Sequence, residues 1–290
     1  MIAALRILLS LAGALWLASC SASSAPEEDW PAPSPALWEV TSPGGQTGWV
    51  FGTVHALPDD LEWRTSTLED AIATSGVLVV EIADLDDPSG AALFADLSET
   101  PGQPPLSSRV DDDERADLLV LMEDADMEDS DFSRIESWAA AMMLSSQVRS
   151  GGPRNGVDRA LTREAAEVIG LETISGQLSL FDGLSNEAQA DLLHGVALSH
   201  AANTSQQVLR AWLTGDEAQL IAHVNQSLDV SRELRRVLLT ERNARWLEDI
   251  VELVERGRRP LVAVGAGHVI GEDGLVALLQ ARGFEVRRIE

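Results

Sequence analysis

Two kinds of hydrophobic spacing alternate along the chain after residue 36. Residues 77–82 (VLVVEI) and 261–264 (LVAV) are near-continuous apolar runs, which predict strands buried on both faces of a sheet. Residues 37–40 and 47–54 flank a Pro-Gly-Gly turn and predict a hairpin. Two further short strands are expected at 171–174 and 284–289.

Most of the remaining chain shows the spacing of amphipathic helices. A long helix is expected over 231–256, because Ser231 is a suitable N-cap and Gly257 ends the pattern. A helix over 157–169 is expected to stop at Gly170. The other expected helices are 65–75, 111–126, 132–148, 186–202, 206–213, 217–224 and 273–282.

The order of these elements predicts an α/β fold. Strands near both ends of the chain enclose a helical block over about 105–257. We expect the N- and C-terminal strands to form one mixed central sheet, with the large helical insertion as a cap or second layer. No boundary between independent domains is evident, so residues 36–290 are expected to form a single domain.

The first 20 residues resemble a bacterial lipoprotein signal. An apolar run over 7–18 ends in Leu-Ala-Ser-Cys at Cys20, and it is too short to span a bilayer. We expect residues 1–19 to be removed, Cys20 to carry lipid, and residues 20–35 to form a flexible tether. Ser21, where Asp would favour the inner membrane, indicates the outer membrane, facing the periplasm. An ordinary secretory signal with an incidental cysteine is the alternative.

The charge balance changes the list of plausible partners. The chain has 47 acidic residues against 21 basic ones, all of them arginine, and a formal net charge of −26. Phosphate binding needs a basic surface, so no nucleic-acid partner is expected. Attraction to anionic lipid is also disfavoured, which leaves lipid on Cys20 as the expected contact with the membrane. Cys20 is the only cysteine, so no intrachain disulfide is possible.

Two similar segments carry the candidate chemistry. Each is a predicted strand followed by Gly, two residues and His, at Gly52–His55 and Gly265–His268. Histidines that follow strands in this way project at the carboxyl edge of a sheet, where α/β proteins bind ligands. Glu81 lies in the apolar run 77–82, where a carboxylate is costly unless it is paired, protonated or bound to metal.

Two imidazoles and one carboxylate form a ligand set that suits a divalent ion with open positions for water. Asp273 lies where it could orient His268 from behind. The alternative is that each histidine is structural. The chain has no His-Glu-x-x-His motif, no Gly-x-Ser-x-Gly elbow and no complete dinucleotide fingerprint, so other common enzyme classes are unsupported.

Five segments in order resemble the TraB/GumN family, which is similar to the Tiki metalloproteases. They are FGTVHALP at 51–58, VVEI at 79–82, GVD at 156–158 with GLET at 170–173, ERN at 241–243, and GAGH at 265–268 with GEDGL at 271–275 and GFEV at 283–286. The resemblance covers about 37–289, nearly the whole mature domain.

The resemblance implies a metal-dependent hydrolytic site, with His55, His268 and Glu81 as ligand or catalytic positions. It implies that Arg242 and Asn243 hold substrate or stabilise an oxyanion, although neighbours on a helix point about a hundred degrees apart. Asp158 either supports the site or caps the helix that begins beside it.

The sequence therefore predicts a lipid-anchored envelope hydrolase that acts on a peptide or small polar substrate, with Mn, Co or Zn as the expected ion. The alternative is a non-catalytic envelope lipoprotein that binds a peptide or polysaccharide.

Overall fold

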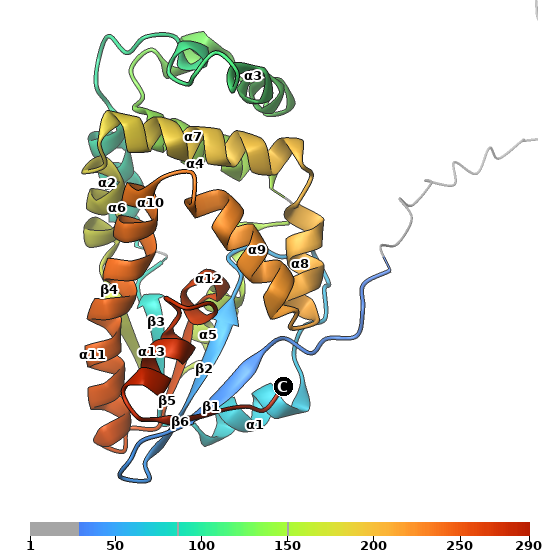
Figure 1. Ribbon diagram of the computed structural model, residues 1–290, viewed down its shortest axis with the longest axis vertical. Helices are drawn as coiled ribbons and strands as arrows, with labels where there is room; N and C mark the ends of the chain where they lie inside the picture. Colours follow the sequence, from blue (N-terminus) through green and yellow to red (C-terminus); the bar gives the residue numbers. More distant parts are fainter. Residues whose placement is uncertain (1–28, 86, 150) are drawn as a thin grey trace, which may run out of the picture. The chain divides into compact units, whose positions relative to one another are not determined.

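A mixed sheet with the strand order β4-β3-β5-β2-β1-β6 organises the fold (Figure 1). β2, β5, β3 and β4 run parallel, whereas β1 pairs antiparallel with β2 and β6. This arrangement confirms the expected mixed sheet, in which strands from both ends of the chain lie side by side. The strands are β1 (Leu37–Thr41), β2 (Thr47–Thr53), β3 (Val77–Ile82), β4 (Val168–Glu172), β5 (Pro260–Gly265) and β6 (Glu285–Arg288).

The computed structural model describes residues 29–85, 87–149 and 151–290, and the elements above belong to the unit Pro31–Glu290. The expected signal peptide, Cys20 and residues 20–28 of the expected tether lie outside the described residues. In the part of the chain that is described, each helix is too short or too polar to cross a bilayer.

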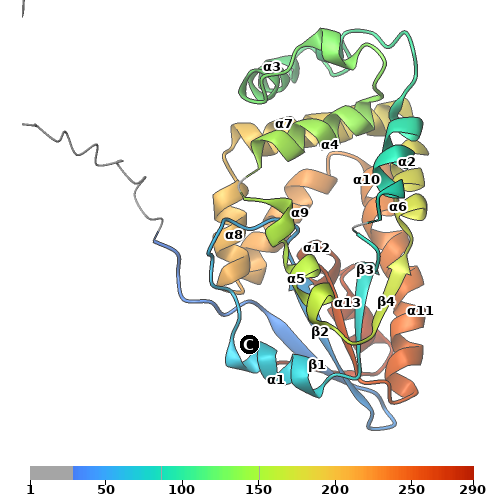
Figure 2. The same cartoon turned by 180° about the vertical axis from the view of Figure 1, so that it is seen from behind.

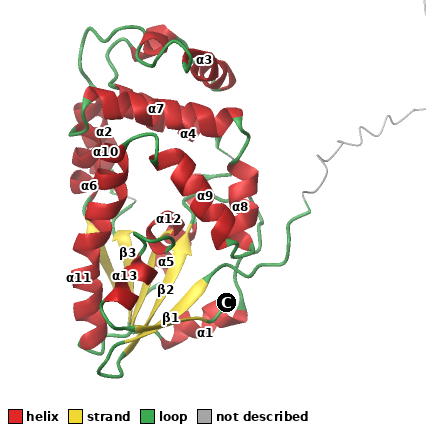
Figure 3. Cartoon of the chain, in the orientation of Figure 1, coloured by secondary structure: helices red, strands yellow, loops and turns green. Residues whose placement is uncertain are grey.

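Helices surround the sheet and form the large insertion (Figure 3). α2 and α6 were not expected, and the other long helices lie close to their expected positions. The helices are α1 (Ser66–Thr74), α2 (Ser89–Ser98), α3 (Arg115–Asp124), α4 (Ser137–Val148), α5 (Val157–Glu164), α6 (Ile174–Asp182), α7 (Asn186–Ala201), α8 (Ser205–Leu213), α9 (Glu217–Leu228), α10 (Arg232–Arg235), α11 (Glu241–Glu255), α12 (Ala266–Val269) and α13 (Leu275–Ala281).

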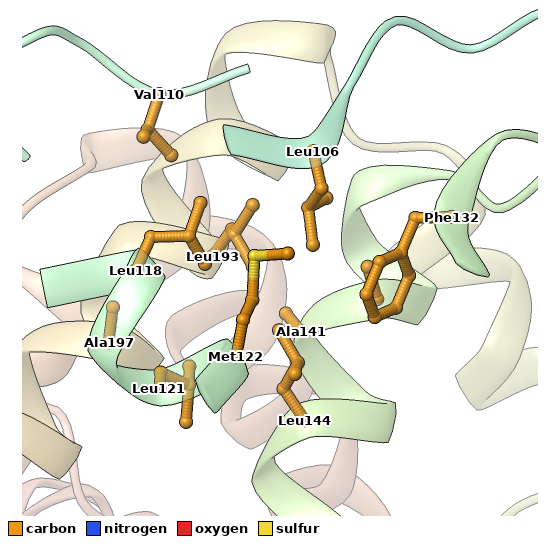
Figure 4. Packing of buried hydrophobic residues seen from close by; sticks show 11 residues of the cluster. Leu106, Val110, Leu118, Leu121, Met122, Phe132, Ala141, Leu144, Leu193 and Ala197 are labelled. Carbon is orange, nitrogen blue, oxygen red and sulfur yellow. The ribbon is translucent and has the colours of Figure 1, made fainter. Parts of the chain in front are cut away.

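α4 and α7 form the layer beyond the carboxyl ends of β2 and β3, and α3 packs on their outer side (Figures 1 and 2). A separate hydrophobic cluster holds this layer together. Leu118 and Leu121 of α3, Leu144 of α4 and Leu193 of α7 are fully buried in it (Figure 4). The insertion therefore has its own core, as expected of a cap.

Two of the expected helices were wrong in extent. The helix expected over 157–169 ends at Glu164, because residues 168–172 form β4 beside β3. The strand expected at 171–174 accordingly begins three residues earlier and ends at Glu172. Main-chain pairing of Val168 with Leu78 and of Ile169 with Val79 satisfies backbone groups that a longer α5 would have satisfied internally.

The long helix expected over 231–256 is interrupted. A π-helical segment at Arg236–Thr240 separates α10 from α11. Such segments are rare and are enriched at functional sites, because the wider turn re-aims the side chains that follow it. Arg242 and Asn243 lie immediately after this segment, on the first turn of α11.

Candidate functional site

The carboxyl edge of the sheet gathers three of the residues that the sequence singled out. His55 follows β2, Glu81 lies near the end of β3, and His268 lies in α12, directly after β5. Because β2, β5 and β3 are parallel neighbours, their carboxyl ends lie at one edge. Arg242 of α11 reaches this edge from the side of the sheet where β4 ends.

The Arg242 guanidinium is the centre of the cluster. Its Nη2 donates to Glu81 Oε2 at 2.7 Å and to Glu172 Oε2 at 2.8 Å, and its Nε donates to Glu172 at 3.1 Å. Its Nη1 donates to the Leu238 carbonyl in the π-helical segment. The Arg242 side chain is only 6% exposed, so these contacts are made away from bulk water. A buried guanidinium with two carboxylates is stable because each charge has a partner.

His268 is held on both ring nitrogens. Asn243 Oδ1 accepts from Nδ1 at 2.7 Å, and Arg242 Nη1 lies 3.0 Å from Nε2. Asn243 Nδ2 donates to the carbonyls of His268 and Asp273, which fixes the orientation of the amide. Arg242 and Asn243 thus both face His268, although they are adjacent on one helix, because Arg242 is long and Asn243 is short.

The carboxylate of Asp273 has a different partner from the expected one. Its Oδ2 accepts from Arg235 Nε at 3.0 Å, and only its backbone carbonyl contacts Asn243. Asn243 occupies the position beside His268 Nδ1 in which Asp273 was expected.

His55 has an acidic partner. Its Nδ1 lies 2.8 Å from Asp158 Oδ2, and the other oxygen of Asp158 accepts from the Thr53 hydroxyl. Asp158 is the second residue of α5, whose N-cap is Gly156, and its two carboxylate oxygens contact Thr53 and His55. The protein around the imidazole would lower the pKa of His55 by partial desolvation, although the side chain is 64% exposed, but the hydrogen bond and charge of Asp158, together with the charge of Glu81, raise the pKa to about 9. His55 is therefore protonated at neutral pH.

His268 and Glu81 shift in the opposite direction from His55. Burial, together with the charge of Arg242, lowers the pKa of His268 to about 4. Burial alone would raise the pKa of Glu81, but His268, His55, Arg242 and the Gly265 N–H lower it to about 2. At neutral pH the cluster thus contains a cationic His55, a neutral His268 and an ionised Glu81.

A cavity of about 350 Å³ opens beside His55, and we call it the sheet-edge pocket. Glu81 and Gln177 line it, and Gln177 Nε2 donates to Glu81 Oε2 at 3.2 Å. Its remaining polar residues are Asp158, Arg149 and Arg159, and its apolar wall consists of Val80, Ile82, Leu85 and Met142.

The model of the TraB/PrgY/gumN family matches residues 36–288. The chain belongs to the TraB/PrgY/gumN family. No curated protein sequence and no solved structure matches it significantly. The family match includes His55, Glu81, Arg242 and His268, the residues that meet at the carboxyl edge of the sheet.

The three expected metal ligands of this TraB/PrgY/gumN chain do not point toward one common site. His55 and Glu81 approach one point, because a Cβ on Gly265 would lie 3.5 Å from His55 Nε2 and 3.1 Å from Glu81 Oε1. His268 Nε2 faces the Arg242 guanidinium instead. Among the described residues, no three His, Cys, Asp or Glu side chains are placed to hold one metal ion. The arrangement therefore does not fit an ion held by all three expected ligands.

Sequence reasoning on this TraB/PrgY/gumN chain did not assign a role to Glu172, Gln177 or Arg149. Glu172 is the second carboxylate on Arg242 and also accepts from the Trp246 indole at 3.2 Å. A glutamate at the end of an apolar strand is the same signal that identified Glu81. Gln177 and Arg149 gave no signal, because Gln177 lies within α6 and Arg149 directly follows α4, and the contact of these segments with the sheet edge depends on tertiary structure.

Proposed function

We propose that this chain is a lipid-anchored hydrolase of the cell envelope that cleaves a peptide or another small polar substrate in the sheet-edge pocket. The observation that carries the proposal is the meeting of His55 Nε2 and Glu81 Oε1 beside Gly265, with both side chains lining the sheet-edge pocket. Groups with strongly shifted pKa values in a cleft are characteristic of catalytic sites. Family membership supports the proposal at the level of the fold.

The chemistry of the cluster suits hydrolysis through general acid catalysis. His55 is protonated at neutral pH, and its Nε2 faces the pocket while Asp158 holds its Nδ1. It can donate a proton to the leaving group as the scissile bond breaks. Glu81, kept ionised by Arg242, accepts a hydrogen bond from the attacking water and orients it. Glu81 takes the proton that the water loses as the new C–O bond forms, and this proton then passes to His55, which has given its own to the leaving group of the broken bond. Gly265 is needed at this point because a side chain would fill the space of that water.

The envelope location is proposed from residues 1–20 alone, where the lipoprotein signal ends at Cys20. Metabolic labelling with a palmitate analogue tests it. The wild-type chain should be labelled, and Cys20→Ser should not. Label on Cys20→Ser, or none on the wild type, would contradict the anchor.

An unbiased peptide-library cleavage assay of the purified full-length chain tests the hydrolase. We expect cleavage by the wild type, a loss of at least about a hundredfold in His55→Ala, and wild-type activity in His200→Ala, whose imidazole pairs with Asp124 in the helical insertion. No cleavage by the wild type under any metal condition would contradict the proposal.

The same assay decides metal dependence. We derive no step through an ion, because Arg242 lies between His268 and Glu81. Activity after chelation that is unchanged by added Mn, Co or Zn would agree with this arrangement. Restoration by one of these ions, with loss of bound metal in a His55→Ala/His268→Ala variant measured by mass spectrometry, would show that the expected ligands rearrange around an ion.

The second candidate is a non-catalytic envelope lipoprotein that binds a peptide or polysaccharide. One observation favours it: both oxygens of Glu81 already accept hydrogen bonds, from Gly265, Arg242 and Gln177. Binding of library peptides without cleavage would support this alternative.

A further inference from the structure

We propose that Arg149 binds a carboxylate of the ligand in the sheet-edge pocket, so that the pocket selects ligands with an anionic group beside a short apolar one. This inference rests on the proposed function, because it assigns the chemical class of the substrate. It concerns recognition and holds whether the bound molecule is cleaved or only retained.

Arg149 lines the pocket without an internal partner. The Arg149 guanidinium makes no hydrogen bond or ion pair with any residue in the described ranges. By contrast, the Arg242 guanidinium contacts four residues, and Arg159 donates to the Leu85 carbonyl. The chain has 47 acids and 21 bases, and most arginines in the described residues form an ion pair with an acidic side chain. An arginine left without one at the wall of a pocket is suited to an anion from outside.

Backbone contacts join the chain that follows Arg149 to the loop of His55. The segment after Arg149 is attached to the loop of His55: Gly152 N donates to the Leu57 carbonyl, and Val157 N donates to the Val54 carbonyl, both at 3.0 Å. This approach requires glycine, since a Cβ on Gly156 would lie 2.5 Å from the His55 carbonyl oxygen. Arg149 and the proposed acid His55 therefore line one pocket from two segments that are hydrogen-bonded to each other close by.

The other side chains that line the pocket indicate which chemical group of the ligand lies next to its carboxylate. Val80, Ile82, Leu85 and Met142 supply an apolar surface on the same pocket. The volume of about 350 Å³ suits a group with the size of one or two amino-acid residues. A carboxylate on Arg149 with an aliphatic group on this wall is the arrangement of a peptide's carboxyl-terminal residue.

Arg149 also borders a second cavity of about 330 Å³, which contains Val208 and His223. We assign the carboxylate to the sheet-edge pocket because His55 lines that pocket and not the second cavity, and the residues that follow Arg149 are hydrogen-bonded to the loop of His55. The methyl groups of Met142 and Val208 can report which cavity is occupied, since Met142 lines only the sheet-edge pocket and Val208 lines only the second cavity.

The test uses 4-methylpentanoate and the uncharged 4-methylpentan-1-ol, neither of which has a bond that a hydrolase could cleave. Each is titrated into the full-length chain and followed by NMR of the methyl groups. We expect the carboxylate to bind about tenfold more tightly than the alcohol, with shifts at Met142. Arg149→Gln should abolish the preference, Arg149→Lys should retain part of it, and Arg154→Gln, an exposed neighbour, should leave it unchanged.

Equal binding of the two probes, no binding of either, or a preference that survives in Arg149→Gln would overturn the inference. Shifts confined to Val208 would overturn the assignment to the sheet-edge pocket. Failure of the proposed function is distinguishable, because the cleavage assay can be negative while the carboxylate preference is present.

Discussion

The two Gly-x-x-His segments place identical side chains in opposite electrostatic surroundings. His55 is 64% exposed and paired with Asp158, which helps to raise its pKa to about 9. His268 is buried and contacts Asn243 and Arg242, and its pKa falls to about 4. The shared motif thus specifies where each imidazole projects, and the partner supplied by another helix decides its charge. One histidine is equipped to donate a proton, and the other to accept a hydrogen bond.

The strongest way to break this contrast is to remove the guanidinium on the His268 side. Arg242→Met leaves Glu81 and Glu172 buried without their shared cation. We expect a loss of about 3–5 kcal/mol in the free energy of unfolding, measured by chemical denaturation, because an uncompensated buried charge is costly. In protein that stays folded, the pKa of His268 should rise, since Arg242 opposes its protonation.

Arg245→Met is the matched control. Its guanidinium lies 3.6 Å from the same Glu172 but is 53% exposed, so we expect about 0–1 kcal/mol. Equal losses in the two variants would contradict the central role of Arg242.

The second way to break the contrast between the two histidines is to neutralise Asp158, the acidic partner of His55. Asp158→Asn retains the shape of the side chain but removes the charge that holds the His55 proton. We expect the pKa of His55 to fall well below 9 in an NMR titration, and peptide cleavage at neutral pH to fall with it. Asp158 is only 5% exposed and also accepts from Thr53, so stability should decrease by about 1–3 kcal/mol. An unchanged His55 pKa would show that another group sets it.

The positions of the two histidines could be predicted from the sequence more fully than the partners that surround them. The apolar runs predicted β3 and β5, and the hairpin pattern predicted β1 and β2. Parallel pairing of β2, β5 and β3 then brings His55, Glu81 and His268 to one edge. The partners were harder to predict. Asn243 stands beside His268 where Asp273 was expected, and it closely follows a π-helical segment that no apolar spacing reveals. Similarly, the pattern over 157–169 fits a helix as well as a strand, and only pairing with β3 decides it.

A third, smaller effect is the pH dependence of the His55–Asp158 pair. The folded-state pKa of His55 lies above the unfolded value of about 6.5, so the pair's contribution to stability is complete below that value. It declines as the pH rises through about 9. The difference in unfolding free energy between the wild type and His55→Gln should therefore be largest near pH 6 and vanish by about pH 10. Solvent screening limits it to about 1 kcal/mol, since His55 is 64% exposed. A difference that grows with pH would have the wrong sign.

The smallest effect is expected at Asp273, the residue that the sequence placed beside His268. Asp273→Asn removes a carboxylate that pairs with Arg235 and retains the backbone carbonyl that accepts from Asn243. The Asp273 side chain is 39% exposed, so we expect a change of about 0–0.5 kcal/mol in stability. The pKa of His268 should stay near 4, because Asn243 and Arg242 make its contacts. A clear shift in that pKa would mean that the charge of Asp273 acts on His268 after all, and that both imidazoles depend on an acidic partner.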